Sequence, residues 1–210
     1  MSFRIEDKFF LHSQNLDKLK LWIKLQKGKV MYPKRYITSL YFDTENNKSL
    51  IDSEEGIVPR KKIRFRSYDN LLNFKKEIFF EKKITSVEGK YKISEKINEY
   101  KLNNYLKKGI IVLDHGIVFP KIYVTYLRYY YVIKDLKINI DMNIKYRRFK
   151  FNDIDSLSIN DNDIVLEIKA PMDINFKNII DTLPFNLRRF SKYSRGILYI
   201  NNQNRYLIKN

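Results

Sequence analysis

The most informative segment of the chain reads Lys62-Ile63-Arg64-Phe65-Arg66. Successive side chains of a β-strand point to opposite faces, so the three basic residues share one face and the two apolar residues share the other. A solvated strand face usually mixes charges of both signs with serine and threonine. This segment therefore predicts a strand with one apolar face and one face that concentrates positive charge.

The same alternation recurs in other strand-like segments. In residues 163–170, Glu167 and Lys169 lie on the face opposite Ile164, Leu166 and Ile168. The other charged faces carry Arg4, Glu6 and Lys8; Glu81 and Lys83; and Lys137, Asn139 and Asp141. Most of these faces place a carboxylate two residues away from a basic side chain.

Strand-like segments dominate the chain. They lie near residues 3–11, 36–43, 61–69, 77–85, 121–133, 136–149 and 163–170. Helical patterns cover residues 14–27, 94–108 and 173–182, with a shorter one near 190–200, and the second is expected to begin at Ser94. Many strands joined by short turns with few helices favour an α+β fold with a barrel-like antiparallel core.

Length and composition exclude several classes of protein. The 210 residues suit one large domain, and 44% hydrophobic with 31% charged residues is the composition of a folded chain rather than a disordered one. The absence of cysteine excludes disulfides, thiolate zinc sites and cysteine nucleophiles. Two histidines are too few for a multi-histidine metal site.

The formal charge of +17 makes the protein attractive to polyanions such as nucleotide phosphates, polyphosphate, nucleic acid or anionic lipid. Charge alone does not choose among them. The N-terminus carries charges where a signal peptide needs an apolar run, and no segment approaches the roughly 18 apolar residues of a membrane span. We expect a soluble, cytoplasmic protein.

The charged strand faces allow two interpretations. They belong either to a sheet with a solvated face, or to a closed barrel whose charged faces point inward and whose apolar faces are covered by helices. Arginines at two-residue spacing suit a phosphate chain, because a guanidinium binds phosphate oxygens in a bidentate manner. Isolated carboxylates among them could hold a divalent cation.

Six short segments along the chain together resemble the vacuolar transporter chaperone (VTC) domain, the polyphosphate polymerase member of the triphosphate tunnel metalloenzyme superfamily. They are Arg4-Ile5-Glu6-Asp7-Lys8, Ser39-Leu40-Tyr41-Phe42-Asp43-Thr44, Lys62-Ile63-Arg64-Phe65-Arg66, Phe80-Glu81-Lys82-Lys83, Val165-Leu166-Glu167-Ile168-Lys169 and Phe190-Ser191-Lys192-Tyr193. The resemblance spans essentially the whole chain and favours the inward-facing barrel.

The resemblance implies a single domain over residues 1–210, built as a closed eight-stranded antiparallel β-barrel with helices packed outside. Such a tunnel binds a nucleoside triphosphate and transfers its terminal phosphate to a growing polyphosphate chain with a divalent metal, Mn²⁺ or Mg²⁺. ATP and polyphosphate are the implied ligands, and no nucleic acid is expected. A separate membrane protein is a possible partner by family analogy.

The resemblance also assigns roles to individual residues. It implies catalytic phosphate ligands at Lys8, Arg64, Arg66, Lys83, Arg128 and Lys169. It implies substrate-binding residues at Arg4, Lys137, Arg189 and Lys192. It implies Glu167 as the principal metal ligand, with Glu6 and Glu81 as weaker metal or charge-balancing candidates.

Three functional classes stay open at this point. The chain is a polyphosphate polymerase, a metal-dependent hydrolase of triphosphate or nucleoside triphosphate, or a non-catalytic module that binds polyphosphate. Phosphoryl transfer depends on positioning and charge stabilisation, so no nucleophilic side chain is required. The attacking group, a polyphosphate end or water, decides between polymerase and hydrolase.

Several other conspicuous residues have simpler structural interpretations. We expect Tyr41 and Phe42 to pack in the sheet wall, Asp43 to end a strand at a turn, and Trp22 to anchor the core. The run Tyr129-Tyr130-Tyr131 is expected to pack against neighbouring strands rather than to stack on bases.

Overall fold

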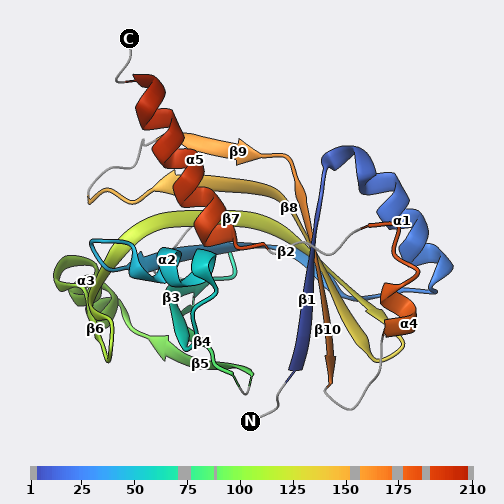
Figure 1. Cartoon of the computed structure of the whole chain (residues 1–210), viewed down its shortest axis with the longest axis horizontal. Helices are drawn as coiled ribbons and strands as arrows, with labels where there is room; N and C mark the ends of the chain where they lie inside the picture. Colours follow the sequence, from blue (N-terminus) through green and yellow to red (C-terminus); the bar gives the residue numbers. More distant parts are fainter. Residues whose placement is uncertain are drawn as a thin grey trace. The chain divides into compact units, whose positions relative to one another are not determined.

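The computed structural model describes residues 4–70, 77–87, 89–151, 157–171, 177–185 and 190–207. The strands are β1 (Arg4–Leu11), β2 (Lys29–Asp43), β3 (Arg60–Ser67), β4 (Ile78–Thr85), β5 (Lys90–Ile97), β6 (Ile110–Val112), β7 (Gly116–Ile133), β8 (Leu136–Arg148), β9 (Ser158–Asp161) and β10 (Ile164–Pro171) (Figure 1). The helices are α1 (Leu16–Leu25), α2 (Lys48–Glu55), α3 (Glu99–Lys108), α4 (Lys177–Ile180) and α5 (Lys192–Leu207), and a 3-10 turn, η1 (Ser13–Asn15), precedes α1.

The described strands form one sheet. Its hydrogen-bonded order is β1-β10-β8-β7-β2-β3-β4-β5, with β6 paired to β7 and β9 paired to β8. The β1–β10, β10–β8, β2–β3, β3–β4 and β4–β5 pairs are antiparallel, which confirms the predicted antiparallel architecture. Because β1 and β5 stand at the two ends of this order, closure of the sheet into a barrel stays a prediction.

The chain divides into two compact units. Unit 1 comprises Met1–Tyr36, Tyr126–Ile144 and Asp161–Phe190, and unit 2 comprises Ile37–Thr125, Lys145–Asn160 and Ser191–Asn210. The long strands β2, β7 and β8 contribute residues to both units.

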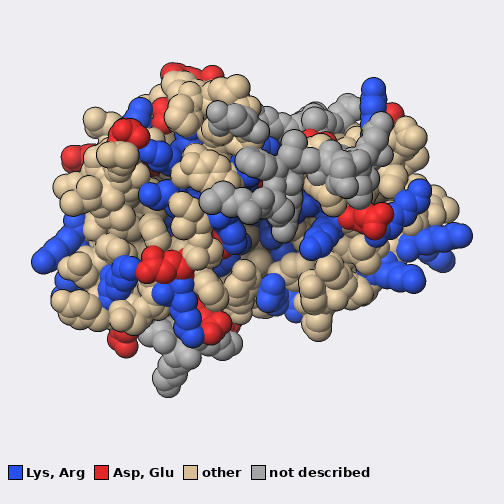
Figure 2. All heavy atoms as spheres, turned by 90° about the horizontal axis from the view of Figure 1, so that it is seen from below, with Lys and Arg blue, Asp and Glu red and all other residues tan. Residues whose placement is uncertain are grey.

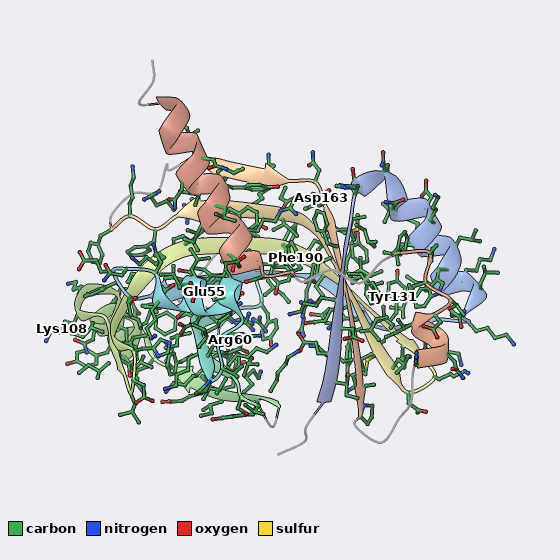
Figure 3. All side chains as sticks on the ribbon, in the orientation of Figure 1. Glu55, Arg60, Lys108, Tyr131, Asp163 and Phe190 are labelled. Atoms are coloured by element: carbon green, nitrogen blue, oxygen red, sulfur yellow. The ribbon has the colours of Figure 1, made fainter. Side chains whose placement is uncertain are left out.

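The core of unit 1 lies between α1 and the apolar face of β1, β10 and β8. Leu19, Trp22 and Ile23 are spaced to form one face of α1, and all three are buried against these strands. The Trp22 indole donates a hydrogen bond to Thr182 at 2.9 Å, which confirms its predicted anchoring role. Tyr131 also packs against this core, as predicted (Figure 3).

The core of unit 2 lies on the apolar face of β2, β3 and β4. Leu40, Phe42, Ile63 and Phe65 are at most 1% exposed, and Leu102 of α3 covers them. Alternation places Arg64 and Arg66 on the opposite face of β3. The local pattern of the sequence thus determined which side of each strand enters the apolar core.

The helix α5 packs on a charged strand face, whereas the apolar faces were the ones expected to be covered by helices. Tyr193 of α5 stacks on Tyr41, which lies directly opposite Arg64 and so on the charged face of unit 2. A Cβ at Gly196 would lie 2.5 Å from Tyr146, so the helix approaches β8 as closely as a glycine permits. The apolar side of α5 is therefore buried on the face that also carries the arginines.

The predicted start of the second helix differs from the structure. The second helix begins at Glu99, and Ser94 belongs to β5, where it pairs with Glu81 of β4. Asn98 is the residue that caps α3, through a hydrogen bond from the Lys101 backbone N–H at 2.8 Å. Strand pairing with β4, which the local sequence does not reveal, overrides the capping preference of serine.

Other differences concern short elements. The helix α2 and the strands β5, β6 and β9 were not predicted. The strands β6 and β9 have three and four residues, too few for a clear periodic pattern, and the second half of β5 was assigned to the predicted helix 94–108. Of the predicted helix 173–182, the part before residue 177 lies outside the described residues, and α4 occupies Lys177–Ile180. The predicted helix near 190–200 is confirmed as α5, which extends to Leu207.

Positive charge dominates the surface. Figure 2 shows more lysine and arginine than acidic side chains on the face that it displays, as the charge of +17 requires. None of the helices in the described ranges combines the length and the apolar character needed to cross a membrane.

Candidate functional site

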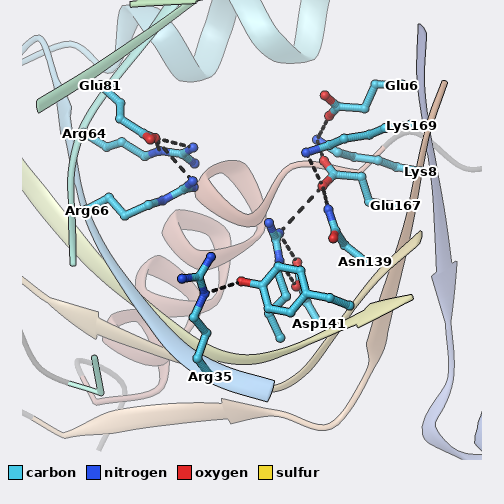
Figure 4. Close-up of polar contacts among 12 residues, drawn as sticks. Glu6, Lys8, Arg35, Arg64, Arg66, Glu81, Asn139, Asp141, Glu167 and Lys169 are labelled. Carbon is cyan, nitrogen blue, oxygen red and sulfur yellow. Dashed lines mark hydrogen bonds and ion pairs between the residues drawn. The ribbon is translucent and has the colours of Figure 1, made fainter. Parts of the chain in front are cut away.

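The charged face of unit 1 gathers one set of polar side chains, which we call the Glu167 cluster. Its members are Glu6, Lys8, Arg128, Asn139, Asp141, Glu167 and Lys169 (Figure 4). The strand register explains this grouping, because Lys8 of β1 lies opposite Glu167 of β10, and Glu167 lies opposite Asn139 of β8. Directly opposed residues of an antiparallel pair share a face.

Glu167 is the centre of this cluster. Its carboxylate lies 3.4 Å from the Lys8 ammonium and 3.1 Å from the Lys169 ammonium, and it accepts a hydrogen bond from Asn139 at 3.1 Å. Only 6% of the residue is exposed. Burial raises the pKa of Glu167, but the charges of its basic neighbours, led by Lys169, outweigh burial and hold the pKa well below its usual range.

Arg128 completes the cluster through a bidentate pair. Its guanidinium donates to Asp141 at 2.6 and 2.8 Å and lies 3.7 Å from Glu167. Burial lowers the pKa of Arg128, but the Asp141 carboxylate more than compensates, so the pKa lies well above its usual value. The side chain is therefore a fixed positive charge beside Glu167.

The charged face of unit 2 carries a second set, which we call the Arg64 cluster. Its members are Tyr41, Lys62, Arg64, Arg66, Glu81 and Lys92. The Glu81 carboxylate lies 2.7 Å from Arg64, 3.4 Å from Arg66 and 3.1 Å from Lys92 (Figure 4). One buried carboxylate thus faces three cations.

The electrostatics of the Arg64 cluster are dominated by its cations. Burial raises the pKa of Glu81, yet the three neighbouring positive charges and the hydrogen bond from Arg64 lower it to about 2. Tyr41 accepts a hydrogen bond from Arg64 at 2.9 Å. Burial also raises the pKa of Tyr41, and the charges of Arg64, Arg66 and Lys192 lower it below its usual value. Both shifts reflect the positive potential that the cations create around Glu81 and Tyr41.

The beginning of α5 is tied to the Arg64 cluster by two contacts. Ser191 accepts a hydrogen bond from Lys62 at 2.9 Å, and Tyr193 stacks on Tyr41 with a centroid distance of 5.4 Å. Lys192 stands between these two residues, and its charge acts on the Tyr41 phenol. The structure therefore brings the predicted substrate-binding residue Lys192 to the Arg64 cluster.

Asp43 anchors Tyr193. The carboxylate is fully buried and accepts hydrogen bonds from the backbone N–H groups of Thr44, Ser49 and Leu50, at the start of α2. It also accepts the Tyr193 hydroxyl at 2.6 Å. Asp43 thus ends its strand at a turn, as predicted, and in addition connects α2 to α5.

Replacing Tyr193 with phenylalanine is expected to lower the free energy of unfolding at pH 7 by about 1.5–3 kcal/mol, because it removes a hydrogen bond to a buried carboxylate. Burial and the Asp43 charge raise the Tyr193 pKa, so the stabilisation is present below about pH 10 and declines as the pH rises further. Urea titration at pH 7 measures the difference. Tyr100→Phe, at a tyrosine that is 83% exposed, is the matched control, and equal effects of both variants would contradict the anchoring role.

The predicted site residues are distributed between the two clusters. Lys8, Arg128, Lys169, Glu6 and Glu167 belong to the Glu167 cluster, and Arg64, Arg66 and Glu81 belong to the Arg64 cluster. Lys83 lies directly opposite Lys62, on the same face of unit 2. Lys137 is exposed and lies opposite Lys169. Arg189 and the side chain of Arg4 fall outside the described part of the chain.

Several residues of the two clusters, and one that contacts them, were not predicted from the sequence to be site residues. Asn139 and Asp141 were placed on a charged strand face, but the pairing of Asp141 with Arg128 was not predicted. Tyr193 and Lys62 were likewise not assigned to the site, although they make the contacts that hold α5. The available signal was the alternation itself, which places Lys62 beside Arg64 on one face.

The central residues of the charged faces are buried rather than solvated. Glu81, Glu167, Arg66 and Arg128 are between 2% and 9% exposed. The interpretation of a solvated charged face is therefore wrong for these residues. Burying several like charges is costly without compensating partners, so such faces are typical of sites that bind a charged ligand.

Two carboxylates of the Glu167 cluster form a pair. Glu6 and Glu167 both contact the Lys8 ammonium, at 2.7 and 3.4 Å, and so lie close to one another. Within the described ranges, no group of three or more acidic or histidine side chains could hold a metal ion by itself. One or two carboxylates with substrate phosphates suffice for Mg²⁺, and Glu6 with Glu167 fits that donor set.

The fold is shared with several solved structures of low sequence identity. A proposed adenylate cyclase from Bacillus halodurans matches with a TM-score of 0.58 and 11% identity over 90% of this chain and 94% of that chain. A conserved hypothetical protein from Pyrococcus furiosus matches with a TM-score of 0.56 and 14% sequence identity, over 90% of this chain and 98% of that chain. A proposed adenylyl cyclase from Hippeastrum, described as having a dominant triphosphatase activity, matches with a TM-score of 0.53 and 16% sequence identity. The match covers 92% of this chain and 94% of that chain.

The sequence itself matches one family. No curated protein is similar to it. The model of the VTC domain matches residues 3–117 and 111–201, which include both clusters and the start of α5. The chain therefore belongs to the VTC domain family.

Proposed function

We propose that this chain is a metal-dependent polyphosphate polymerase. The observation that carries the proposal is the buried Arg64 cluster, in which Arg64, Arg66 and Lys92 surround the single carboxylate of Glu81 in a chain of the VTC domain family. An excess of fixed cations on a buried face suits a phosphate chain, whose oxygens accept the forked hydrogen bonds of guanidinium groups.

In this proposal the two clusters have different tasks. The Arg64 cluster and Lys192 bind phosphate groups, and the lowered pKa of Tyr41 reports the positive potential that they create. Lys8, Lys169 and Arg128 of the Glu167 cluster neutralise the negative charge of the transferred group and of the leaving diphosphate. Glu6 and Glu167 would hold the divalent cation, which supplies further charge neutralisation on the phosphate oxygens.

The proposed step transfers one phosphoryl group. A terminal oxygen of polyphosphate attacks the γ-phosphorus of ATP, the bond from that phosphorus to the β,γ-bridging oxygen breaks, and ADP and a chain longer by one phosphate result. The side chains of the chain form no covalent intermediate in this scheme, because phosphoryl transfer needs positioning and charge stabilisation above all. One closed tunnel domain over residues 1–210, a cytoplasmic location and a membrane-protein partner stay predictions.

A triphosphatase is the second candidate, favoured by the triphosphatase activity described for the Hippeastrum protein of similar fold. In that reaction water replaces the polyphosphate end as the attacking group. Incubation of the purified chain with ATP and Mn²⁺, followed by measurement of polyphosphate, ADP and free phosphate, distinguishes the two. Polymer with an equal amount of ADP supports the polymerase, free phosphate without polymer supports the hydrolase, and binding without turnover contradicts both.

Replacing Arg64 with alanine is expected to weaken the binding of inorganic triphosphate by about 10- to 100-fold, the loss of one charge-assisted hydrogen-bonding group. Isothermal titration calorimetry measures the change. Lys82→Ala is the matched control, because it removes one positive charge from the opposite face of the neighbouring strand. Equal affinities of the two variants would show that net charge, and not the Arg64 cluster, binds the ligand.

A further inference from the structure

Tyr41 of β2 is a buried tyrosine on the charged face of unit 2. It lies directly opposite Arg64 of β3, and only 6% of the residue is exposed. Its hydroxyl oxygen accepts a hydrogen bond from Arg64 at 2.9 Å, and the guanidinium carbon lies 5.6 Å from the centre of the ring. Tyr193 stacks on the same ring. Arg64 and Tyr193 therefore hold the Tyr41 hydroxyl in one position.

The hydrogen of this hydroxyl has no acceptor within the described part of the chain. A phenol can accept and donate at the same time, but a guanidinium has donors only, so the Tyr41 hydrogen does not bind to Arg64. None of the residues in the described ranges accepts it. Buried donors in folded proteins are almost always paired, so an unused donor on a cationic face indicates that its acceptor comes from solution.

Arg66 supplies a second donor of this kind. It lies two residues beyond Arg64 on the same face, is 8% exposed, and approaches Glu81 through one terminal nitrogen at 3.4 Å (Figure 4). Its Nε–H is buried and has no hydrogen-bond partner among the described residues. The buried hydroxyl of Ser39, directly opposite Arg66, likewise makes no hydrogen bond to them. Neighbouring positions of β2 and β3 thus present several buried groups that can donate to an anion.

The charges around Tyr41 favour such an anion. Burial raises the pKa of Tyr41, but the charges of Arg64, Arg66 and Lys192 outweigh burial and lower the pKa below its usual value. The same charges polarise the O–H bond toward an acceptor. Arg66 is the diagonal neighbour of Tyr41 across the β2–β3 pair, a separation that long side chains bridge. One phosphate group can therefore accept hydrogen bonds from both.

We propose that Tyr41 is a phosphate-binding residue whose hydroxyl donates a hydrogen bond to an oxygen of the phosphate group that Arg66 contacts. The inference rests on the proposed function and adds a neutral donor to the cations of the Arg64 cluster. The hydrogen bond from Arg64 to the Tyr41 oxygen and the one from Tyr41 to phosphate form a chain in which each bond strengthens the other. A neutral donor binds the anion without adding to the repulsion among buried like charges.

The experiment separates direct contact from an effect through Arg64. Tyr41→Phe keeps the ring that stacks on Tyr193, but it removes the hydroxyl and with it the acceptor that Arg64 uses. A double-mutant cycle with Arg64→Ala distinguishes the two roles. If Tyr41 only positions Arg64, its hydroxyl contributes nothing to binding once the Arg64 side chain is absent.

Isothermal titration calorimetry with inorganic triphosphate measures each variant. Tyr41→Phe is expected to weaken binding about tenfold relative to the wild type, the scale of a hydrogen bond to a charged group. In the Arg64→Ala background, the same replacement is expected to weaken binding by a further factor of about five. Tyr105→Phe is the matched control, because Tyr105 stacks on Phe65 at the apolar face of β3, and it should change the affinity by less than about twofold.

Three results would overturn the inference: unchanged affinity in Tyr41→Phe, equal losses in Tyr41→Phe and Tyr105→Phe, or no further loss in the Arg64→Ala background. Its failure is separable from that of the proposed function. A chain that makes no polymer from ATP but loses triphosphate affinity through Tyr41→Phe in both backgrounds would refute the polymerase and support the inference. Polymer formation by the wild type with no effect of Tyr41→Phe on binding would do the reverse. A wild-type chain that binds no triphosphate would refute both.

Discussion

Replacing Glu167 with glutamine is expected to lower the metal-dependent turnover of ATP by about 100-fold or more, on the scale of other losses of a charge-stabilising group in an active site. Glutamine keeps the volume and the hydrogen-bonding partner Asn139 but removes a carboxylate that the cations Lys8 and Lys169 hold ionised. The assay measures ADP release at saturating ATP across a range of Mn²⁺ concentrations.

A binding measurement separates the loss of the metal ligand from a damaged site. Removing one negative charge from a cationic face should leave the metal-free binding of triphosphate unchanged or tighter, even as turnover falls. Glu77→Gln is the matched control, since the Glu77 side chain is 62% exposed and pairs with Lys96 at the surface. Full turnover of ATP by Glu167→Gln at saturating Mn²⁺ would show that Glu167 is not a metal ligand.

Replacing Glu81 with glutamine is expected to lower the free energy of unfolding at pH 7 by about 3–5 kcal/mol, the cost of leaving buried cations without their partner. The lowered pKa of Glu81 leads to a similar contribution to the free energy of unfolding. A carboxyl with a pKa of about 2 in the folded protein and 4.5 in the unfolded chain contributes about 3 kcal/mol at neutral pH. Urea unfolding at several pH values measures the difference between the variant and the wild type.

The pH dependence has a definite sign. Because folding lowers the pKa of Glu81, its contribution is complete above about pH 5 and disappears as the pH falls toward 2. The difference between wild type and Glu81→Gln should therefore shrink over that interval. Glu95→Gln, at an exposed surface pair, should cost less than about 1 kcal/mol. A difference in unfolding free energy that does not change between pH 5 and pH 2 would show that the neighbouring cations do not lower the pKa of Glu81.

Much of the candidate site was predictable because strand alternation is a local property. Arg64 and Arg66 share a face for the same reason that Ile63 and Phe65 share the other, and no tertiary contact is needed to derive it. The apolar faces were equally predictable, and they form the cores of both units. The structure was needed to show whether the charged faces are buried or solvated.

The grouping of the carboxylates was not predictable from alternation. Glu167 was the expected principal metal ligand, and Glu6 and Glu81 were the weaker metal or charge-balancing candidates. The structure places Glu6 and Glu167 on one ammonium group in unit 1 and Glu81 among three cations in unit 2. The difference arises from the order of strands, since β1 lies beside β10 and β3 beside β4. Glu81 and Glu167 each lie among three cations, and Glu167 differs from Glu81 in having a second carboxylate, Glu6, on the same ammonium group.

The antiparallel strands, the two faces of each strand and the family were predictable from the amino-acid sequence, because they depend on residues that are close in the chain or on recurrent short motifs. Tertiary structure alone decided which charges neutralise one another, that Asp43 holds Tyr193 across 150 positions, and that Arg35 rests on Tyr130. The physical reason is that a hydrogen bond or ion pair acts over a few ångströms, and the partners at that distance are set by strand order and helix packing, which no local pattern encodes.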